Sequence, residues 1–223
     1  MSVLALRLAG PLQAWGTSSV YQSRESGRVP SKSGVVGLLA AALGRQRSAD
    51  ISDLAALPMA VRCDRPGAVL RDFQTVDYGK TAPQVTTRYY LSGAAFLAVM
   101  EGDPGFLHQL GSAVRAPHWA LYLGRRSCPP AGPVLMGVTD ESMDEALESL
   151  PYLGRTDGAA RGSMRLDVVR DARRGEHATG FERDLPLTFH PDRARYAGRP
   201  TVQTTVTVSW GERAAVHDPF TAL

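Results

Sequence analysis

The sequence predicts an α+β fold in which helices pack against an antiparallel sheet. The first observation is an apolar strand over residues 2–9, followed by an Ala- and Leu-rich helix over 33–43. The second is that strand and helix patterns continue in alternation to residue 123. The third is a run of Thr and Val near the end of the chain, a composition typical of strands. Mixed helices and strands in this order favour an α+β domain.

Local signals mark the ends of the predicted elements. Gly44 supplies a C-cap for the first helix, and Pro58 ends a short second helix. A turn sequence over 64–67 joins two strands, and Pro104 suits the first turn of a later helix. In chain order we predict a strand over 2–9, helices over 33–43 and 50–57, strands over 59–63 and 69–76, a long strand over 88–101, a helix over 103–115 and a strand over 118–123.

This order of elements predicts a ferredoxin-like or RRM-like domain. The polar segment 77–87 contains Gly79, Lys80 and Pro83, and we expect it to protrude as a loop between two strands. The Pro- and Gly-rich segment 128–133 is the best candidate boundary. We therefore assign residues 1–138 to the RRM-like domain and 139–223 to a smaller β-rich subdomain. In the second part we expect an acidic helix over 140–150, strands near 164–169, 185–190 and 201–210, and a loosely held tail over 213–223.

Composition restricts the classes of function. The chain has 223 residues, 43% of them hydrophobic, and a formal net charge of +3. It contains no apolar run of the roughly 18 residues that span a bilayer and no signal-peptide pattern, so we expect a cytoplasmic protein without membrane contact. The two cysteines, Cys63 and Cys128, form no zinc motif, and we expect no metal and no cofactor.

The cations are almost all arginine, since Lys32 and Lys80 are the only lysines among 25 Lys and Arg residues. Arginine suits bidentate phosphate contacts and stacks on bases. A GC-rich genome produces the same bias throughout a proteome. The arginine content therefore favours an RNA partner without establishing one.

The segment Ser31–Gly34 is the most suggestive candidate site. It opens the first helix, where unpaired backbone N–H groups and the helix dipole favour an anion. Lys32 would add charge, Ser33 a hydroxyl group and Gly34 a close backbone approach to a phosphate. The alternative is an ordinary Ser N-cap followed by an exposed Lys. The segment lacks the first glycine of a Walker A loop, which argues against ATP binding.

Two other segments allow a functional and a structural interpretation. Trp15 either stacks on a base or packs beneath the first helix, and Gln13 is a candidate for a base-edge contact. Arg125 and Arg126 follow a predicted strand and either hold phosphate or pair with the acidic helix.

Five segments in this order resemble the fifth CRISPR-associated protein family of the RAMP superfamily, in its subtype I-E form. They cover residues 6–16 (LRLAGPLQAWG), 30–44 (PSKSGVVGLLAAALG), 71–76 (RDFQTV), 88–97 (RYYLSGAAFL) and 121–130 (LYLGRRSCPP). The resemblance is strong over about residues 2–135 and weak beyond them. It implies an RRM-like domain with a β-hairpin thumb, here at about 77–88, and a smaller C-terminal β subdomain.

The resemblance also implies a function in antiviral defence. Such subunits bind the 5′ handle of the CRISPR RNA and cap the backbone-subunit filament of the Cascade complex, in contact with its large subunit. In subtype I-E another subunit cuts the repeat, so no catalytic residue is implied here. With the family in view, the expected RNA-contacting residues are Gln13, Trp15, Arg24, Ser31, Lys32, Ser33, Gly34, Gln74, Tyr78, Lys80, Arg88, Arg125, Arg126, Arg155 and Arg161.

Two alternatives remain open at this point. One is a metal-independent endoribonuclease that processes repeat RNA, for which His118 and Tyr21, with Lys32 or Arg125, would supply the acid, base and cation. Nothing in the sequence brings these residues together. The other alternative is a protein scaffold whose arginines are genomic in origin.

Overall fold

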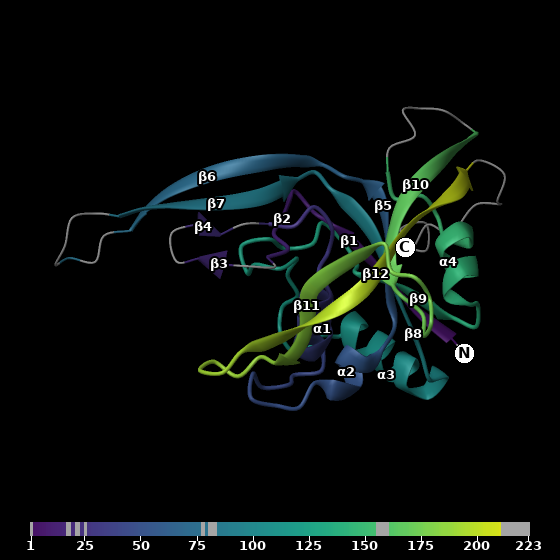
Figure 1. Ribbon diagram of the computed structural model, residues 1–223, viewed down its shortest axis with the longest axis horizontal. Helices are drawn as coiled ribbons and strands as arrows, with labels where there is room; N and C mark the ends of the chain where they lie inside the picture. The colour runs from purple at the N-terminus through teal and green to yellow at the C-terminus, as the bar shows by residue number, and fades with distance from the viewer. Residues whose placement is uncertain are drawn as a thin grey trace, which may run out of the picture.

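Figure 1 shows the computed structural model of the chain. The structure describes residues 2–16, 19–20, 23–24, 26–76, 79, 84–154 and 161–210. In this part of the chain, helices and strands are mixed, and the larger of two sheets is antiparallel and curled. The fold class predicted from the sequence, α+β, agrees with this architecture.

The larger sheet has seven strands in the order β11-β12-β10-β5-β8-β1-β9, and every neighbouring pair is antiparallel. Within this sheet, β1 pairs with β8 from Ser2↔Gly102 to Ala9↔Ala95. The strands are β1 (Ser2–Ala9), β5 (Met59–Arg65), β8 (Ala95–Gly102), β9 (Leu135–Thr139), β10 (Gly162–Asp171), β11 (Gly180–Thr188) and β12 (Arg195–Trp210).

Helices cover both faces of the central strands. Helices α1 (Lys32–Ala42), α2 (Ser52–Ala56) and α3 (Pro104–Arg115) pack on Leu4, Leu6 and Leu8 of β1. Helix α4 (Met143–Ser149) packs on Val3 and Ala5, which point to the opposite face. Burial on both sides explains why β1 is a nearly continuous apolar run, interrupted by Arg7. In an RRM, RNA bases stack on one open face of the sheet. Here the described helices cover both faces of the central strands, so these strands offer no such open face.

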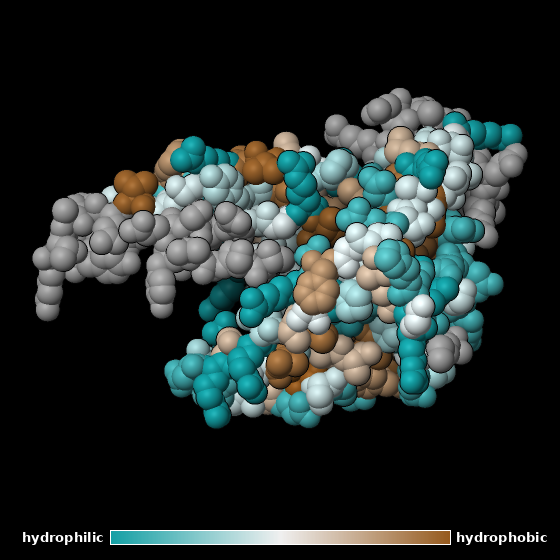
Figure 2. Space-filling model, in the orientation of Figure 1, coloured by the Kyte–Doolittle hydropathy of each residue, from teal (hydrophilic) through white to brown (hydrophobic). Residues whose placement is uncertain are grey.

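The smaller sheet is built around a long hairpin that extends away from the body (Figure 1). The hairpin pairs β6 (Ala68–Val76) with β7 (Gln84–Ser92), and β7 also contacts β2 (Leu12–Gln13) and β4 (Ser23–Arg24). Strand β3 (Ser19–Val20) pairs with β4. Hydrophobic side chains lie exposed on the described part of the hairpin, as Figure 2 shows: Val69, Leu70, Phe73 and Val85.

Most predicted elements and helix caps are present. Asp103 caps α3 by accepting a hydrogen bond from the Phe106 N–H at 2.9 Å, with Pro104 in the first turn. The acidic helix, observed as α4, begins with a capping box between Ser142 and Glu145. These caps lie close to their helices in sequence, which is why local patterns find them.

Three predictions about strands are wrong. The segment 118–123 forms no strand, and the place beside β1 belongs to β9. The expected single strand over 88–101 is divided into β7 and β8 by Gly93, whose φ of +66° turns the chain from one sheet to the other. The expected loop over 77–87 is shorter, because residues 84–87 belong to β7.

The other predictions of organisation remain untested. The division at residue 138 stays a prediction, and β10, from the second part, pairs with β5 in the same sheet. The expected tail over 213–223 and most of the expected hairpin tip lie outside the described residues. Within the described residues, no helix is both long and apolar enough to cross a membrane.

Candidate functional site

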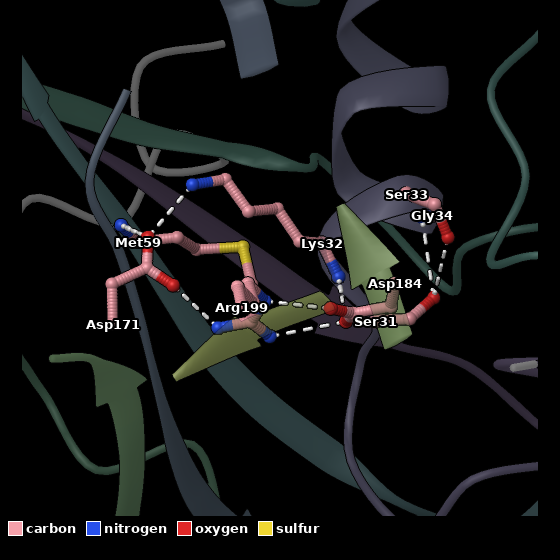
Figure 3. A network of polar contacts seen from close by, with 8 residues as sticks. All are labelled: Ser31, Lys32, Ser33, Gly34, Met59, Asp171, Asp184 and Arg199. Carbon is pink, nitrogen blue, oxygen red and sulfur yellow. Dashed lines mark hydrogen bonds and ion pairs between the residues drawn. The ribbon is translucent and has the colours of Figure 1, made fainter. Parts of the chain in front are cut away.

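The anion-binding site predicted at the N-terminus of α1 is occupied by a side chain of the protein itself. Ser31 is the N-cap and accepts a hydrogen bond from the Gly34 N–H at 3.3 Å. The backbone N–H of Lys32 donates to Asp184 Oδ2 at 2.7 Å, as Figure 3 shows. A carboxylate thus sits where a phosphate was expected, and the helix dipole favours either anion.

The charge of Lys32 is also neutralised within the chain. Its Nζ lies 2.7 Å from Asp171 Oδ2, and its side chain is only 5% exposed. Arg199 donates to both Asp171 and Asp184, so two cations and two anions share one network (Figure 3). Burial alone would lower the pKa of Arg199, but hydrogen bonds and charge from Asp184 and Asp171 raise it above its ordinary value. Lys32 is therefore a buried structural cation in this structure and not the exposed residue of the alternative interpretation.

Trp15 and Gln13 are part of the core. Trp15 is fully buried, and its Nε1–H donates to Gln13 Oε1 at 2.8 Å. Gln13 Nε2 donates to the carbonyl oxygens of Leu8 and Ala94, which leaves its amide inside the protein. Of the two interpretations of Trp15, packing beneath the first helix describes this structure.

Gly34 serves the same packing. A Cβ atom at this position would lie 2.7 Å from the Trp15 ring, closer than real contacts allow. The glycine therefore lets the indole approach the first turn of α1. The close approach that we expected for a phosphate is made by a core tryptophan.

A groove of about 650 Å³ runs along the outer face of α1. Small residues of the helix, Gly34, Gly37 and Ala41 among them, line it. Aromatic side chains come from two separate segments, Trp119 and Tyr122 after α3, and Phe189 and Tyr196 around the turn between β11 and β12. The remaining lining residues are Ala14, Trp15, Gly16, Ser31, Ser33, Ala40, Arg45, Gln46, Arg47, Gly124 and Arg125.

The groove is cationic. Arg45, Arg47 and Arg125 line it, and none of the described lining residues is acidic. Arg125 donates from Nη1 to the Tyr89 carbonyl at 3.2 Å, and its guanidinium carbon lies 4.8 Å from the centre of the Tyr90 ring. Arg45 is held in a two-pronged ion pair by Asp53. Proteins that bind single-stranded nucleic acids commonly do so with arginines beside exposed aromatic rings.

A tight loop presents Arg125 and the exposed Arg126. Gly124 has a φ of +86°, and a Cβ there would lie 1.8 Å from the Ala14 carbonyl oxygen. Only glycine allows this contact between the loop and the segment after β2. The loop is thereby fixed at the end of the groove near the N-terminus of α1, where Ser31 and Ser33 also line the groove.

The structure unites some of the predicted residues and separates others. Ser31, Ser33, Gly34, Trp15 and Arg125 all line the groove. On the hairpin, Arg88 faces Asp72 across the ladder, and Gln74 Nε2 donates to Asp72 Oδ2 at 2.9 Å.

The remaining predicted residues lie elsewhere or outside the description. Arg161 is exposed just before β10. The backbone of Arg24 pairs with that of Arg88, and its side chain is not described. Tyr78, Lys80 and Arg155 lie outside the described residues, as does Tyr21.

Sequence reasoning missed most of the groove. The C-cap of α1 is Leu43, and Gly44 follows it with a φ of +72°. Arg45 and Arg47 come just after this helix end, and that position in the sequence was the available signal. The four aromatic residues gave no local signal, because they come from segments about 70 residues apart in the chain.

The residues named for the endoribonuclease alternative do not all converge. The His118 ring packs on Gly44 beyond the C-terminal end of α1, and the backbone N–H of His118 donates to the Ala42 carbonyl. Lys32 begins the same 11-residue helix, which at 1.5 Å per residue is roughly 16 Å long. No cluster of His, Cys, Asp and Glu suited to a metal ion occurs among the residues that the structure describes.

Comparisons with known proteins agree with this architecture. A family model described as CRISPR-associated protein (Cas_Cas5) matches residues 3–202. The CRISPR system Cascade subunit CasD of Escherichia coli (strain K12) is 42% identical over 164 residues, which are 63% of this chain and 73% of the relative.

Two solved structures share the fold. One, titled "Crystal structure of Cas protein", superposes with a TM-score of 0.74 at 40% identity and covers 91% of this chain and 94% of its own. The other, titled "CRISPR RNA-guided surveillance complex", gives 0.78 at 30% identity, with 93% and 91% covered. The family model and the two shared folds place the chain among CRISPR-associated proteins. More specifically, it belongs to the Cas5 family.

Proposed function

We propose that this chain is the RNA-binding subunit of a subtype I-E Cascade complex, and that it holds the 5′ handle of the CRISPR RNA. The groove beside α1 carries the proposal, because it combines arginines with exposed aromatic rings in a family whose relatives are Cascade and surveillance-complex proteins. The subunit would cap the backbone filament next to the large subunit, in the cytoplasm. It would act without a catalytic step of its own.

The finer layout of the fold supports this role. Strands β5-β8-β1-β9 with α1 and α3 have the order of a ferredoxin-like unit, which we interpret as the RRM-like domain of the family. We interpret the β6–β7 hairpin as the thumb.

The test compares two double variants in the reconstituted complex. Arg125→Ala with Arg126→Ala removes one cation that lines the groove and the exposed cation next to it on the same loop. Arg173→Ala with Arg174→Ala removes two cations from a solvated turn and is the matched control. Loss of two phosphate contacts should weaken retention of labelled CRISPR RNA about tenfold and lower the salt dependence by about 0.7 per contact. Equal retention by both variants would remove the loop from the RNA site.

A second experiment separates this function from the endoribonuclease alternative. Labelled repeat RNA is incubated with the pure protein in EDTA and analysed on a denaturing gel. We expect intact RNA, because His118 lies at the far end of α1 from Lys32. Discrete cleavage that disappears in His118→Ala would replace the proposed function by a metal-independent nuclease.

A further inference from the structure

We propose that the groove beside α1 takes one unstacked nucleotide of single-stranded RNA, with its base against the aromatic side chains and its phosphates at the arginines. This inference rests on the proposed function and assigns a specific pocket to it. The groove volume of about 650 Å³ lies within the range of about 300–1,000 Å³ typical of small-molecule sites. One nucleotide fits a pocket of this size.

The aromatic side chains are placed to receive a base. Trp119 is 39% exposed and Tyr196 is 42% exposed, although both line the same groove. Neighbouring exposed apolar surface on a protein often marks a binding site. The exposed parts of these two rings lie beside one groove and leave aromatic surface that a bound partner could cover. A base offers a flat π-face to such rings and is recognised by stacking, whatever its sequence.

The charge of the groove selects the class of partner. Arg45 and Arg47 lie where α1 ends, and Arg125 lies near its beginning. Asp53 pairs with Arg45, so Arg47 supplies the cation at one end of the groove and Arg125 the cation at the other. A nucleotide in a chain carries a phosphate on each side of its sugar, which matches cations at both ends and an apolar middle.

Gly37 allows the groove to be filled without disturbing the fold. A Cβ atom at this position would meet nothing closer than the Phe189 ring, at 3.8 Å. Because Gly37 lines the groove, a Leu side chain here would project into the space proposed for the base. Replacing a helical glycine also raises helix propensity, so folding should be preserved.

The experiment uses the reconstituted complex with CRISPR RNA that carries 2-aminopurine at each handle position in turn. In the wild type, one position should show quenched fluorescence from stacking on the aromatic rings. Gly37→Ala adds only a methyl group and should keep the quenching. Gly37→Leu should abolish it and weaken handle binding about tenfold, the loss expected for one stacked base.

A second pair of variants tests the rings themselves. Trp119→Ala should also release the quenched base, whereas Trp119→Phe should retain part of the quenching because a ring remains. The Phe variant thus separates loss of stacking from loss of folding.

The outcomes distinguish this inference from the function on which it rests. RNA retained by Gly37→Leu with unchanged quenching overturns the nucleotide pocket alone. Weakened assembly of that variant with unchanged quenching assigns the groove to a protein segment and overturns the pocket as well. A wild-type complex that takes up no CRISPR RNA through this subunit overturns both proposals.

Discussion

Helix α1 has two surfaces with opposite electrostatic roles. At its N-terminal turn, Lys32 and Arg199 are fully engaged by Asp171 and Asp184 inside the protein. Along its outer face, arginines line an open groove together with exposed aromatic rings. The sequence pointed to the first surface as an anion site, yet the second is the one with accessible charge.

The difference shows that a motif for anion binding does not specify which anion binds. A helix N-terminus favours a phosphate and a carboxylate for the same reason, namely its unpaired N–H groups and dipole. In this chain Asp184, on β11, accepts a hydrogen bond from the backbone N–H of Lys32 in the first turn of α1. This bond connects α1 to the edge strand of the curled sheet. Ser31–Gly34 therefore stabilises the fold beside the groove.

The largest effect is expected from a variant that disrupts the buried ion-pair network at the N-terminal turn of α1. Asp184→Asn removes one of two anions from a network that contains two cations and leaves an uncompensated positive charge in the interior. Breaking a buried ion pair in this way costs about 3–5 kcal/mol. Urea unfolding should show this loss in the free energy of unfolding.

The matched control is Asp192→Asn, since the Asp192 side chain is 88% exposed. It should leave the free energy of unfolding within about 0.5 kcal/mol of the wild-type value. If Asp184→Asn were equally harmless, the network would be incidental, and the N-terminal turn would again be available to an external phosphate.

The next effect compares two glycines on the same helix. Gly34→Ala places a methyl group 2.7 Å from the Trp15 ring and should destabilise the protein by about 1–3 kcal/mol through overpacking. Gly37→Ala meets nothing closer than the Phe189 ring at 3.8 Å and should stabilise the protein by up to about 1 kcal/mol through helix propensity.

Thermal unfolding of the two variants measures this contrast directly. The intrinsic fluorescence of Gly34→Ala should also change, because Trp15 must move. Shifts of the same sign in both variants would contradict the view that Gly34 packs against the core and that Gly37 faces the groove.

Local patterns predicted much of the fold because helix caps and turns depend on neighbouring residues. The Asp103 cap, the Ser31 cap and the Gly44 end of α1 are all encoded within a few positions. The assignment of strands to sheets is not encoded in this way. β5 and β6 are separated only by Pro66 and Gly67, yet they belong to different sheets.

The site was harder to predict than the fold, because its contacts are long-range. Asp171 lies 139 residues from Lys32 and Asp184 lies 152 residues from it, so no local pattern shows that this lysine is neutralised. Trp15 had two interpretations in the sequence, and only the position of α1 above it decides between them. The resemblance to a family identified the class of protein, but it gave no information on which cations are accessible.

The smallest effect is expected from a variant that adds accessible positive charge to the groove, and it tests whether the two surfaces of α1 differ in RNA binding. Asp53 binds Arg45 through both carboxylate oxygens, and this hydrogen bonding holds the pKa of Asp53 below its ordinary value. Asp53→Asn keeps one acceptor oxygen but removes the negative charge, so Arg45 gains an uncompensated positive charge at the groove. If accessible charge and not total charge governs RNA binding, handle RNA should bind about twofold to fivefold more tightly, the equivalent of one surface ion pair of about 0.5–1 kcal/mol. The gain should fade as salt is raised, because an exposed charge is screened.

Asp144→Asn is the control, since Asp144 pairs with the exposed Arg173 of the turn and not with a groove residue. Equal gains from the two variants would mean that RNA senses only net charge, and the distinction between the two surfaces of α1 would have no bearing on binding.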